Sequence, residues 1–235
     1  MIRGRMPVHA VTTVAQPQTT TAPKLARREI TGFQPTSKKV KVAFFDADST
    51  LRVSKSGSVS ANSEKDVQLL PFAAKKLKAL AAQGYLIAIV SNQGGVGKSI
   101  TLATADKALQ YTKDLIRLGG GEVHYFDFAE FKDHDRKPDI GMGERLESVI
   151  KAQLGAGYSM DKARSFMVGD SSYTDKQTRP DGRKGFSFSD SDRLFAANYG
   201  IPFHEPQTFF GWDKYGVEEF ERKADVDAFW KKFKP

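Results

Sequence analysis

The stretch VKVAFFDADST, residues 40–50, decides the fold that we expect for this chain. Its first six residues are rich in β-branched and aromatic types and indicate a short, buried strand. Asp46 and Asp48 follow directly, so we expect them on the loop at the carboxyl end of that strand, where open α/β sheets bind their ligands. Two neighbouring carboxylates repel each other unless a cation or a reaction uses them. A lone Asp-x-Asp is more often a solvated turn, so the interpretation depends on the motifs downstream.

Strands and helices alternate beyond this stretch. Further strands are expected at residues 85–90, 122–128 and 166–168. Helices are expected at residues 71–84, 104–118 and 142–154, with a closing helix within residues 217–233 whose aromatic side chains pack on the domain. The repeated order of strand, helix and strand predicts parallel strands joined by right-handed crossovers. The expected fold class is therefore α/β, a three-layer sandwich with a mainly parallel sheet.

Composition and charge limit the classes of protein to be considered. The chain has 235 residues, of which 40% are hydrophobic, enough for one sizeable α/β domain. It contains no cysteine, which excludes disulfides, cysteine-based zinc sites and thiol nucleophiles. No stretch approaches the roughly 18 apolar residues of a membrane span, so we expect no membrane association. The net charge of +8 and the pI near 9.5 favour an anionic partner, with nucleic acid the leading candidate.

Residues 1–37 differ in composition from the rest of the chain. We expect them to form a disordered basic tail before a single domain at residues 38–235, because residues 11–23 show neither a helical nor a strand period. Basic residues precede the first acid, Glu29, a bias that is also typical of mitochondrial transit peptides. The expected location is intracellular, in the nucleus or cytoplasm, with mitochondrial targeting by the tail as the alternative.

Polar motifs stand where the other predicted strands end. The second strand runs into Ser91-Asn92-Gln93, the segment after the third carries Arg136-Lys137-Pro138, and the fourth runs into Gly169-Asp170. Each motif alone is weak evidence, since serine and Gly-Asp often form turns and lysine is usually a solvated surface charge. In a parallel sheet, however, these motifs would converge with Asp46 and Asp48 on one crevice.

The order of these motifs resembles the haloacid dehalogenase superfamily of phosphohydrolases. The matching residues are Asp46-x-Asp48-x-Thr50, Ser91, Lys137 and Gly169-Asp170. Within that superfamily, residues 91–97, 136–142 and 191–203 resemble the phosphatase domain of polynucleotide kinase 3'-phosphatase, and the last string continues to Pro206 and Phe209-Phe210. The resemblance covers residues 38–211 and implies a Rossmann-like, haloacid dehalogenase-like fold with little or no cap domain.

The resemblance also implies a reaction, the Mg²⁺-dependent hydrolysis of a phosphate monoester. Asp46 would be the nucleophile that forms an aspartyl-phosphate, and Asp48 would be the general acid and base. The cofactor Mg²⁺ would be held by Asp46, the backbone carbonyl of Asp48, Asp170 and waters. The implied phosphate-binding residues are Thr50, Ser91, Asn92 and Lys137, with Thr50 also steadying the nucleophile loop.

Two aspartates compete for the second acid of the fourth motif. Asp175 has a spacing from Asp170 that some relatives use, whereas Asp192 opens a helix and aligns better with the family pattern, so we prefer Asp192. The alternative for Asp192 is a helix N-cap without metal contact. One departure from the family pattern is Ser49, which stands where many relatives have glycine.

A polar insertion, residues 173–187, lies between Asp170 and Asp192. A basic loop at this position would either contact a nucleic-acid backbone or be an ordinary solvated loop. The residues that we assign tentatively to nucleic-acid contact are Lys176, Arg179, Arg183 and Lys184.

The expected function is that of a monomeric polynucleotide 3'-phosphatase acting on DNA with 3'-phosphate ends. Its role in strand-break repair comes wholly from the resemblance. Gly97-Lys98-Ser99 looks like the end of a P-loop, but Asn92 occupies the position of the required first glycine, so we expect no nucleotide triphosphate site and no 5'-kinase.

Two alternative functions stay open. One is a small-molecule phosphomonoesterase of the histidinol-phosphate or heptose-bisphosphate type, although many such relatives carry a cysteine-rich zinc loop that this chain cannot build. The other is an inactive scaffold that binds nucleic-acid ends.

Overall fold

The computed structural model describes residues 25–233 and is built on a five-stranded parallel sheet in the order β6-β5-β2-β8-β9. Its strands are β2 (Val42–Phe45), β5 (Leu86–Asn92), β6 (Tyr125–Ala129), β8 (Phe166–Val168) and β9 (Phe203–His204). Two short strand pairs lie beside it, β1 (Lys39–Val40) with β7 (Ser159–Met160) and β3 (Arg52–Val53) with β4 (Gln68–Leu69). The α-helices are α1 (Ala73–Ala82), α2 (Leu102–Leu118), α3 (Gly141–Leu154), α4 (Ser191–Tyr199), α5 (Pro206–Phe210) and α6 (Lys223–Lys232).

The path of the chain places a crevice beside β2, the central strand. From β2 the chain passes through α1 to β5 and through α2 to β6, then returns through α3 to β8 on the other side of β2. Phe45, at the end of β2, pairs with both Ile89 and Val168. Because later strands lie on both sides of β2, the loops that follow β2 and its neighbours diverge at the carboxyl edge of the sheet and open a crevice there.

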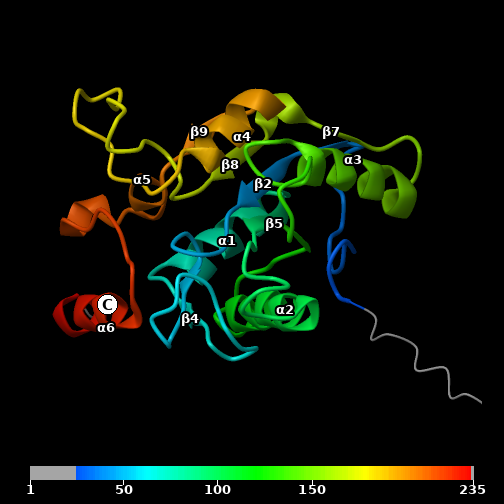
Figure 1. Cartoon of the computed structure of the whole chain (residues 1–235). Coiled ribbons are helices and arrows are strands. Elements are labelled where there is room, and N and C mark those ends of the chain that lie inside the picture. The colour runs from blue at the N-terminus through cyan, green and yellow to red at the C-terminus, as the bar shows by residue number, and fades with distance from the viewer. Residues whose placement is uncertain (1–24, 234–235) are drawn as a thin grey trace, which may run out of the picture.

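Helices cover both faces of the sheet, as Figure 1 shows. Alternate side chains of β2 enter opposite cores, since successive residues of a strand point to opposite faces. Ala43 and Phe45 join the core that contains residues of α1, α2 and α6, whereas Val42 and Phe44 join the core that contains residues of α3 and α4. The predicted three-layer α/β sandwich with a parallel sheet is confirmed. Between β2 and α1, the chain forms only the β3–β4 pair and its loops.

Two helices can be compared in detail with their predictions from the sequence. The helix predicted at residues 71–84 begins later, at Ala73, because Phe72 has a φ of +65° and so lies outside the helical region. The closing helix α6 buries Val226 and Phe229 against the domain, as predicted from its apolar face.

The first described residues pack against the edge strand β6, so the predicted boundary at residue 38 falls inside the folded chain. The amide of Arg28 donates to the carbonyl of Phe126 at 2.9 Å, and the amide of Thr31 donates to the carbonyl of His124 at 2.9 Å. An edge strand leaves backbone groups without partners, and this segment supplies donors for β6. Phe33 is buried in the core beneath α3. Residues 1–24, which make up the remainder of the predicted tail and carry the predicted targeting signal, lie outside the described residues.

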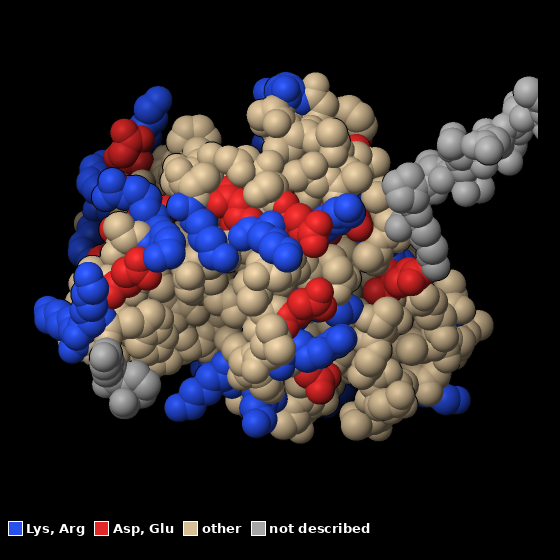
Figure 2. Space-filling model, turned by 90° about the horizontal axis from the view of Figure 1, so that it is seen from below, with Lys and Arg blue, Asp and Glu red and all other residues tan. Residues whose placement is uncertain are grey.

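Within residues 25–233 we find no helix with the length and apolar character needed to cross a bilayer. On the face seen in Figure 2, Lys and Arg side chains lie among Asp and Glu side chains, so the excess positive charge does not gather there into one continuous patch.

Candidate active site

The loops at the carboxyl edge of the sheet bring most of the predicted site residues together. Asp46 continues β2 by donating its amide to the carbonyl of Val168 at 2.9 Å, which fixes the nucleophile loop against β8. Ser91 and Asn92 end β5, and Asp170 follows β8. The expectation that the strand ends meet at one edge is therefore met by the geometry.

Lys137 is the centre of the site. Its Nζ is buried and donates to Asp46 Oδ1 at 2.6 Å and to Asp192 Oδ1 at 2.6 Å. Burial alone would lower the pKa of Lys137, but Asp192 and Asp46 raise it above its ordinary value. The ammonium group therefore stays charged and ties the nucleophile loop to the first turn of α4.

Three carboxylates crowd around this one lysine. Asp46, Asp170 and Asp192 each offer an oxygen atom, and these atoms lie within 4.8 Å of one another. Burial, together with the neighbouring Asp192 and Asp48 and against the opposing effect of Lys137, raises the pKa of Asp46 to about 7. Burial, together with Asp192 and Asp46, also raises the pKa of Asp170 well above its ordinary value. A cluster of buried carboxylate oxygens in excess of its cations fits a hard divalent cation such as Mg²⁺.

Asp192, rather than Asp175, is the acid that joins this cluster. The Asp192 side chain is buried and accepts the amide of Ser171 at 3.1 Å as well as the ammonium of Lys137. The Asp192 side chain fits here because residue 169 is glycine; a Cβ added to Gly169 would lie 2.2 Å from Asp192 Oδ2. Asp175 is exposed and lies in the polar insertion, outside the cluster. The alternative of an N-cap does not describe Asp192, because Asp190 is the residue at the N-cap of α4.

Thr50 contacts Asp170, although we predicted it among the phosphate-binding residues. Its buried hydroxyl donates to Asp170 Oδ1 at 3.2 Å and accepts the amide of Asp170 at 3.1 Å. Because the one hydroxyl proton points at Asp170, the structure supports the other predicted role, that of steadying the loop.

Asn92 differs from its prediction in a similar way. Its side chain donates to the carbonyl of Lys137 at 2.9 Å and accepts the amide of Lys137 at 3.0 Å. Both ends of its amide group therefore hold the backbone of the loop that carries Lys137, which leaves Ser91 and Lys137 as the candidates for contact with a phosphoryl group. Ser91 is buried, and its Oγ accepts from Gln93 at 3.0 Å.

Asp48 is held by two residues to which the sequence analysis gave no role. Arg52 Nε donates to Asp48 Oδ1 at 2.9 Å, and Gln93 Nε2 donates to Asp48 Oδ2 at 2.8 Å. Arg52 is itself buried and fixed by the carbonyl of Ala108 and the hydroxyl of Thr112 in α2. The position of Arg52, four residues after Asp48, is a signal that could have drawn attention to it.

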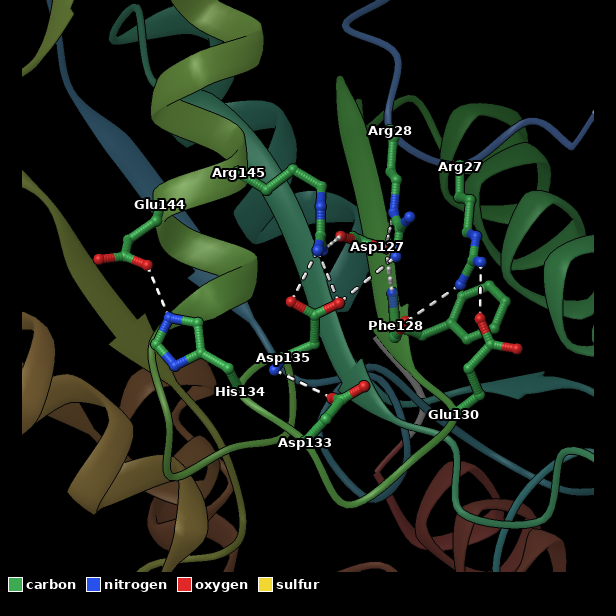
Figure 3. Close-up of polar contacts among 10 residues, drawn as sticks. All are labelled: Arg27, Arg28, Asp127, Phe128, Glu130, Asp133, His134, Asp135, Glu144 and Arg145. Carbon is green, nitrogen blue, oxygen red and sulfur yellow. Dashed lines mark hydrogen bonds and ion pairs between the residues drawn. The ribbon is translucent and has the colours of Figure 1, made fainter.

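A second ionic cluster, shown in Figure 3, holds Asp135, two residues before Lys137 in the same loop. Arg28 and Arg145 bind opposite oxygens of the buried Asp127, at 2.8 Å and 2.7 Å. Arg145 also donates to both oxygens of Asp135, at 2.7 Å and 2.6 Å. Burial would lower the pKa of Arg145, but Asp135 and Asp127 raise it. The N-terminal segment thus takes part, through Arg28, in anchoring the loop that carries Lys137.

Ser49 occupies a position suited to glycine. Its φ is +56°, in the left-handed region that residues other than glycine seldom adopt. Ser49 therefore holds a backbone conformation that glycine adopts more readily.

The four tentative nucleic-acid contacts have different surroundings. Arg179 is buried and donates to Glu205 at 2.6 Å, so it holds the insertion together and is not presented to solvent. Arg183 pairs with Asp181 at 2.9 Å and with Glu218 at 2.8 Å. Lys176 and Lys184 are exposed. The assignment of Arg179 to nucleic-acid contact is therefore withdrawn, because its buried guanidinium group is paired with the carboxylate of Glu205.

The fold matches solved structures of phosphatases. A putative haloacid dehalogenase-like phosphatase from Mesorhizobium loti aligns with a TM-score of 0.56 at 17% identity, over 78% of this chain and 88% of that one. The D,D-heptose 1,7-bisphosphate phosphatase of B. bronchiseptica, crystallised with magnesium and phosphate, aligns with a TM-score of 0.50 at 18% identity, over 69% of this chain and 79% of that one. These likenesses show the class of the fold, which is haloacid dehalogenase-like.

The sequence comparison narrows this class to one family. The model of the polynucleotide kinase 3 phosphatase family matches residues 41–210, and the chain belongs to this family. An uncharacterized 20.8 kDa protein of Autographa californica nuclear polyhedrosis virus is 36% identical over 75% of this chain and 89% of its own length.

Two bifunctional relatives are considerably longer. The bifunctional polynucleotide phosphatase/kinase of Schizosaccharomyces pombe is 32% identical over 78% of this chain, and the putative one of Acanthamoeba polyphaga mimivirus is 32% identical over 73%. The chain spans only 41% and 42% of these two proteins, respectively.

Proposed function

We propose that the protein is a Mg²⁺-dependent polynucleotide 3'-phosphatase that hydrolyses 3'-phosphate monoesters at DNA ends in strand-break repair. The observation that carries the proposal is the buried lysine, Lys137, which bridges Asp46 and Asp192 beside Asp170. Membership of the polynucleotide kinase 3 phosphatase family supports a polynucleotide substrate. We further propose that the protein acts as a monomer inside the cell, where such ends occur.

The reaction would proceed in two steps on this chain's own residues. A carboxylate oxygen of Asp46 attacks phosphorus, the bond to the 3'-oxygen of the sugar breaks, and Asp48 gives its proton to that oxygen. A water molecule then attacks the aspartyl-phosphate and passes its proton to Asp48, which releases inorganic phosphate and restores Asp46. Arg52 and Gln93 orient Asp48, since each binds one of its oxygens.

Lys137 and Ser91 lie where they could stabilise the charge that shifts onto the phosphoryl oxygens. The residues that would hold Mg²⁺ are Asp46, Asp170 and Asp192, and the ion would offset the repulsion between these carboxylates and an incoming phosphate. A retained set of interacting catalytic side chains argues against the inactive scaffold.

The test is phosphate release from a 3'-phosphorylated DNA oligonucleotide, with Mg²⁺ or with EDTA. We expect Mg²⁺-dependent release by the wild type, no detectable release by Asp46→Asn, and wild-type release by Asp175→Asn, a matched change at an exposed acid outside the cluster. Histidinol phosphate and a 3'-phosphorylated RNA oligonucleotide run in parallel. Preference for histidinol phosphate would reject the polynucleotide substrate but keep the chemistry, and binding of DNA without release of phosphate would favour the scaffold.

A further inference from the structure

Two phenylalanines in the β8–α4 loop expose large apolar surfaces next to the candidate active site. Phe188 is fully exposed, at 103%, and Phe186 is 44% exposed. An isolated apolar side chain at the surface is common. Two exposed aromatic side chains separated by a single residue in the sequence are less common, and exposed apolar surface of this kind often marks a binding site. Figure 1 shows this loop, in yellow, projecting from the rest of the molecule beyond β8.

The loop is attached to the catalytic machinery through Ser187, which lies between the two phenylalanines. Ser187 Oγ donates to the carbonyl of Asp170 at 2.7 Å, and the amide of Ser187 donates to the carbonyl of Tyr173 at 2.9 Å. Phe186 lines a surface hollow together with Asp170 and Ser49. The Phe186 ring therefore lies at the edge of the site, and Phe188 follows two residues later on the same loop.

Arg179 supports the orientation of the Phe186 ring. The guanidinium carbon of Arg179 lies 5.3 Å from the centre of the Phe186 ring, and Arg179 is fixed by Glu205 at 2.6 Å. Glu205 also accepts from Ser172 at 2.6 Å, in the segment that follows Asp170. A ring positioned in this way loses little freedom when a planar group stacks on it.

The charge of the loop suits an anionic strand. Lys176 and Lys184 are exposed in the same loop as the two rings. Proteins that bind single-stranded nucleic acid without sequence preference combine basic side chains along the backbone with aromatic side chains on which bases stack.

We infer that Phe186 and Phe188 form a stacking surface for the unpaired bases next to a 3'-phosphate, an inference that rests on the function proposed above. In a paired duplex end, those bases stack on their own neighbours, so their faces are not available to the protein. The loop would then favour 3'-phosphates on single-stranded ends or ends that fray readily, and it would bind the bases without regard to sequence.

The experiment measures kcat and KM for three substrates. They are a single-stranded 3'-phosphorylated oligonucleotide, the same oligonucleotide with abasic sugars at its last positions, and p-nitrophenyl phosphate, which has no base to stack. The variants are Phe188→Ala, Phe186→Ala and Phe188→Trp. The matched control is Leu118→Ala, because Leu118 is also exposed, at 83%, but lies at the end of α2 away from the site.

We expect each alanine variant to raise KM about fivefold or more for the base-bearing oligonucleotide, with little change in kcat. Phe188→Trp should keep KM at the wild-type value, because the indole ring also stacks on bases. For the abasic oligonucleotide, the wild type should have a similarly raised KM that the alanine variants raise no further. All variants should hydrolyse p-nitrophenyl phosphate like the wild type.

Alanine variants whose KM stays within twofold of the wild type on the base-bearing oligonucleotide would overturn the inference, with the proposed function intact. A wild type that hydrolyses p-nitrophenyl phosphate but neither oligonucleotide would instead reject the proposed polynucleotide substrate, and the inference with it.

Discussion

The two ionic clusters that flank the Lys137 loop differ in their balance of charge. The cluster in Figure 3 places Arg28 and Arg145 against Asp127 and Asp135, so its cations and anions are equal in number. The other cluster places Asp46, Asp170 and Asp192 around the ammonium of Lys137. Burial, together with the neighbouring carboxylates, raises the pKa of Asp46 and that of Asp170, so this excess of carboxylates is costly without a further cation. Imbalance of charge, rather than the number of charges, therefore marks the candidate active site.

Removing one cation from each cluster should have unequal effects on stability and on activity. Lys137→Met would leave the buried carboxylates without their partner, at a cost of about 3–5 kcal/mol in the free energy of unfolding, and would remove a phosphate ligand worth at least about 100-fold in kcat. Arg145→Met should cost less, about 1–3 kcal/mol, because the Arg145 side chain is 29% exposed and solvent screens its loss. Urea unfolding and phosphate-release kinetics measure both.

Turnover per folded molecule separates the two roles further. Arg145→Met should keep most of the activity, since Asn92 still holds the Lys137 loop. Equal loss of activity in both variants would mean that the balanced cluster belongs to the active site.

Mg²⁺ should stabilise the protein through the unbalanced cluster, and more so at high pH. In the metal-free protein, burial raises the pKa of Asp46 from its ordinary 3.8 to about 7, so between these values the folded state keeps a proton that the unfolded chain has lost. This contribution to stability is full below the lower value and is lost as the pH rises through the upper one. Because Mg²⁺ competes with protons for the carboxylates, the rise in melting temperature on adding Mg²⁺ should be larger at pH 8 than at pH 5.5.

Asp170→Asn is the variant that checks this prediction, and Asp175→Asn is its control. The Mg²⁺-induced rise in melting temperature should shrink in the first and persist in the second. A rise that is the same for both proteins at both pH values would show that Mg²⁺ binds elsewhere.

The N-terminal segment should matter to the balanced cluster alone. Removing residues 1–24 should leave stability unchanged, whereas removing residues 1–33 uncovers β6 and takes Arg28 from Asp127, so the melting temperature should fall. Arg28→Ala should cost about 1–2 kcal/mol.

Arg27→Ala is the control within the same segment. Arg27 donates to the carbonyl of Phe128 and to Glu130, which lie away from Asp135. If Arg28 anchors the balanced cluster, Arg28→Ala should lower the melting temperature more than Arg27→Ala does, and both variants should keep their turnover per folded molecule. The reverse order would contradict the proposed anchoring of the loop.

The smallest effect is expected at Ser49. Glycine adopts the observed φ of +56° without strain, but it also gives the unfolded chain more freedom. Ser49→Gly should therefore change the free energy of unfolding by less than about 1 kcal/mol and keep turnover. Ser49→Val, a β-branched residue at the same φ, should lower both, as thermal melts and phosphate release would show.

Local patterns predicted the sheet, the alternating helices and the residues at the strand ends, because each depends on short stretches such as residues 40–50. The partners of individual side chains were harder to predict. Arg52 is fixed by residues of α2, 56 and 60 positions away, and Arg179 donates to Glu205, 26 positions away. Thr50 and Asn92 were placed in the correct crevice, but their hydrogen-bond partners depend on how loops from separate strands meet. Residues 25–37 show no strand period, and their docking on β6 depends on the exposed edge of the sheet.

In the proposed function, the unbalanced cluster performs the reaction and the balanced cluster supports the fold. The most direct test compares Asp46→Asn with Asp127→Asn, the same change at a buried aspartate of each cluster, in Mg²⁺-dependent phosphate release from a 3'-phosphorylated oligonucleotide and in melting temperature. We predict that Asp46→Asn stays folded but releases no detectable phosphate, and that Asp127→Asn melts at a lower temperature but keeps its turnover per folded molecule. Normal turnover in Asp46→Asn would contradict the account.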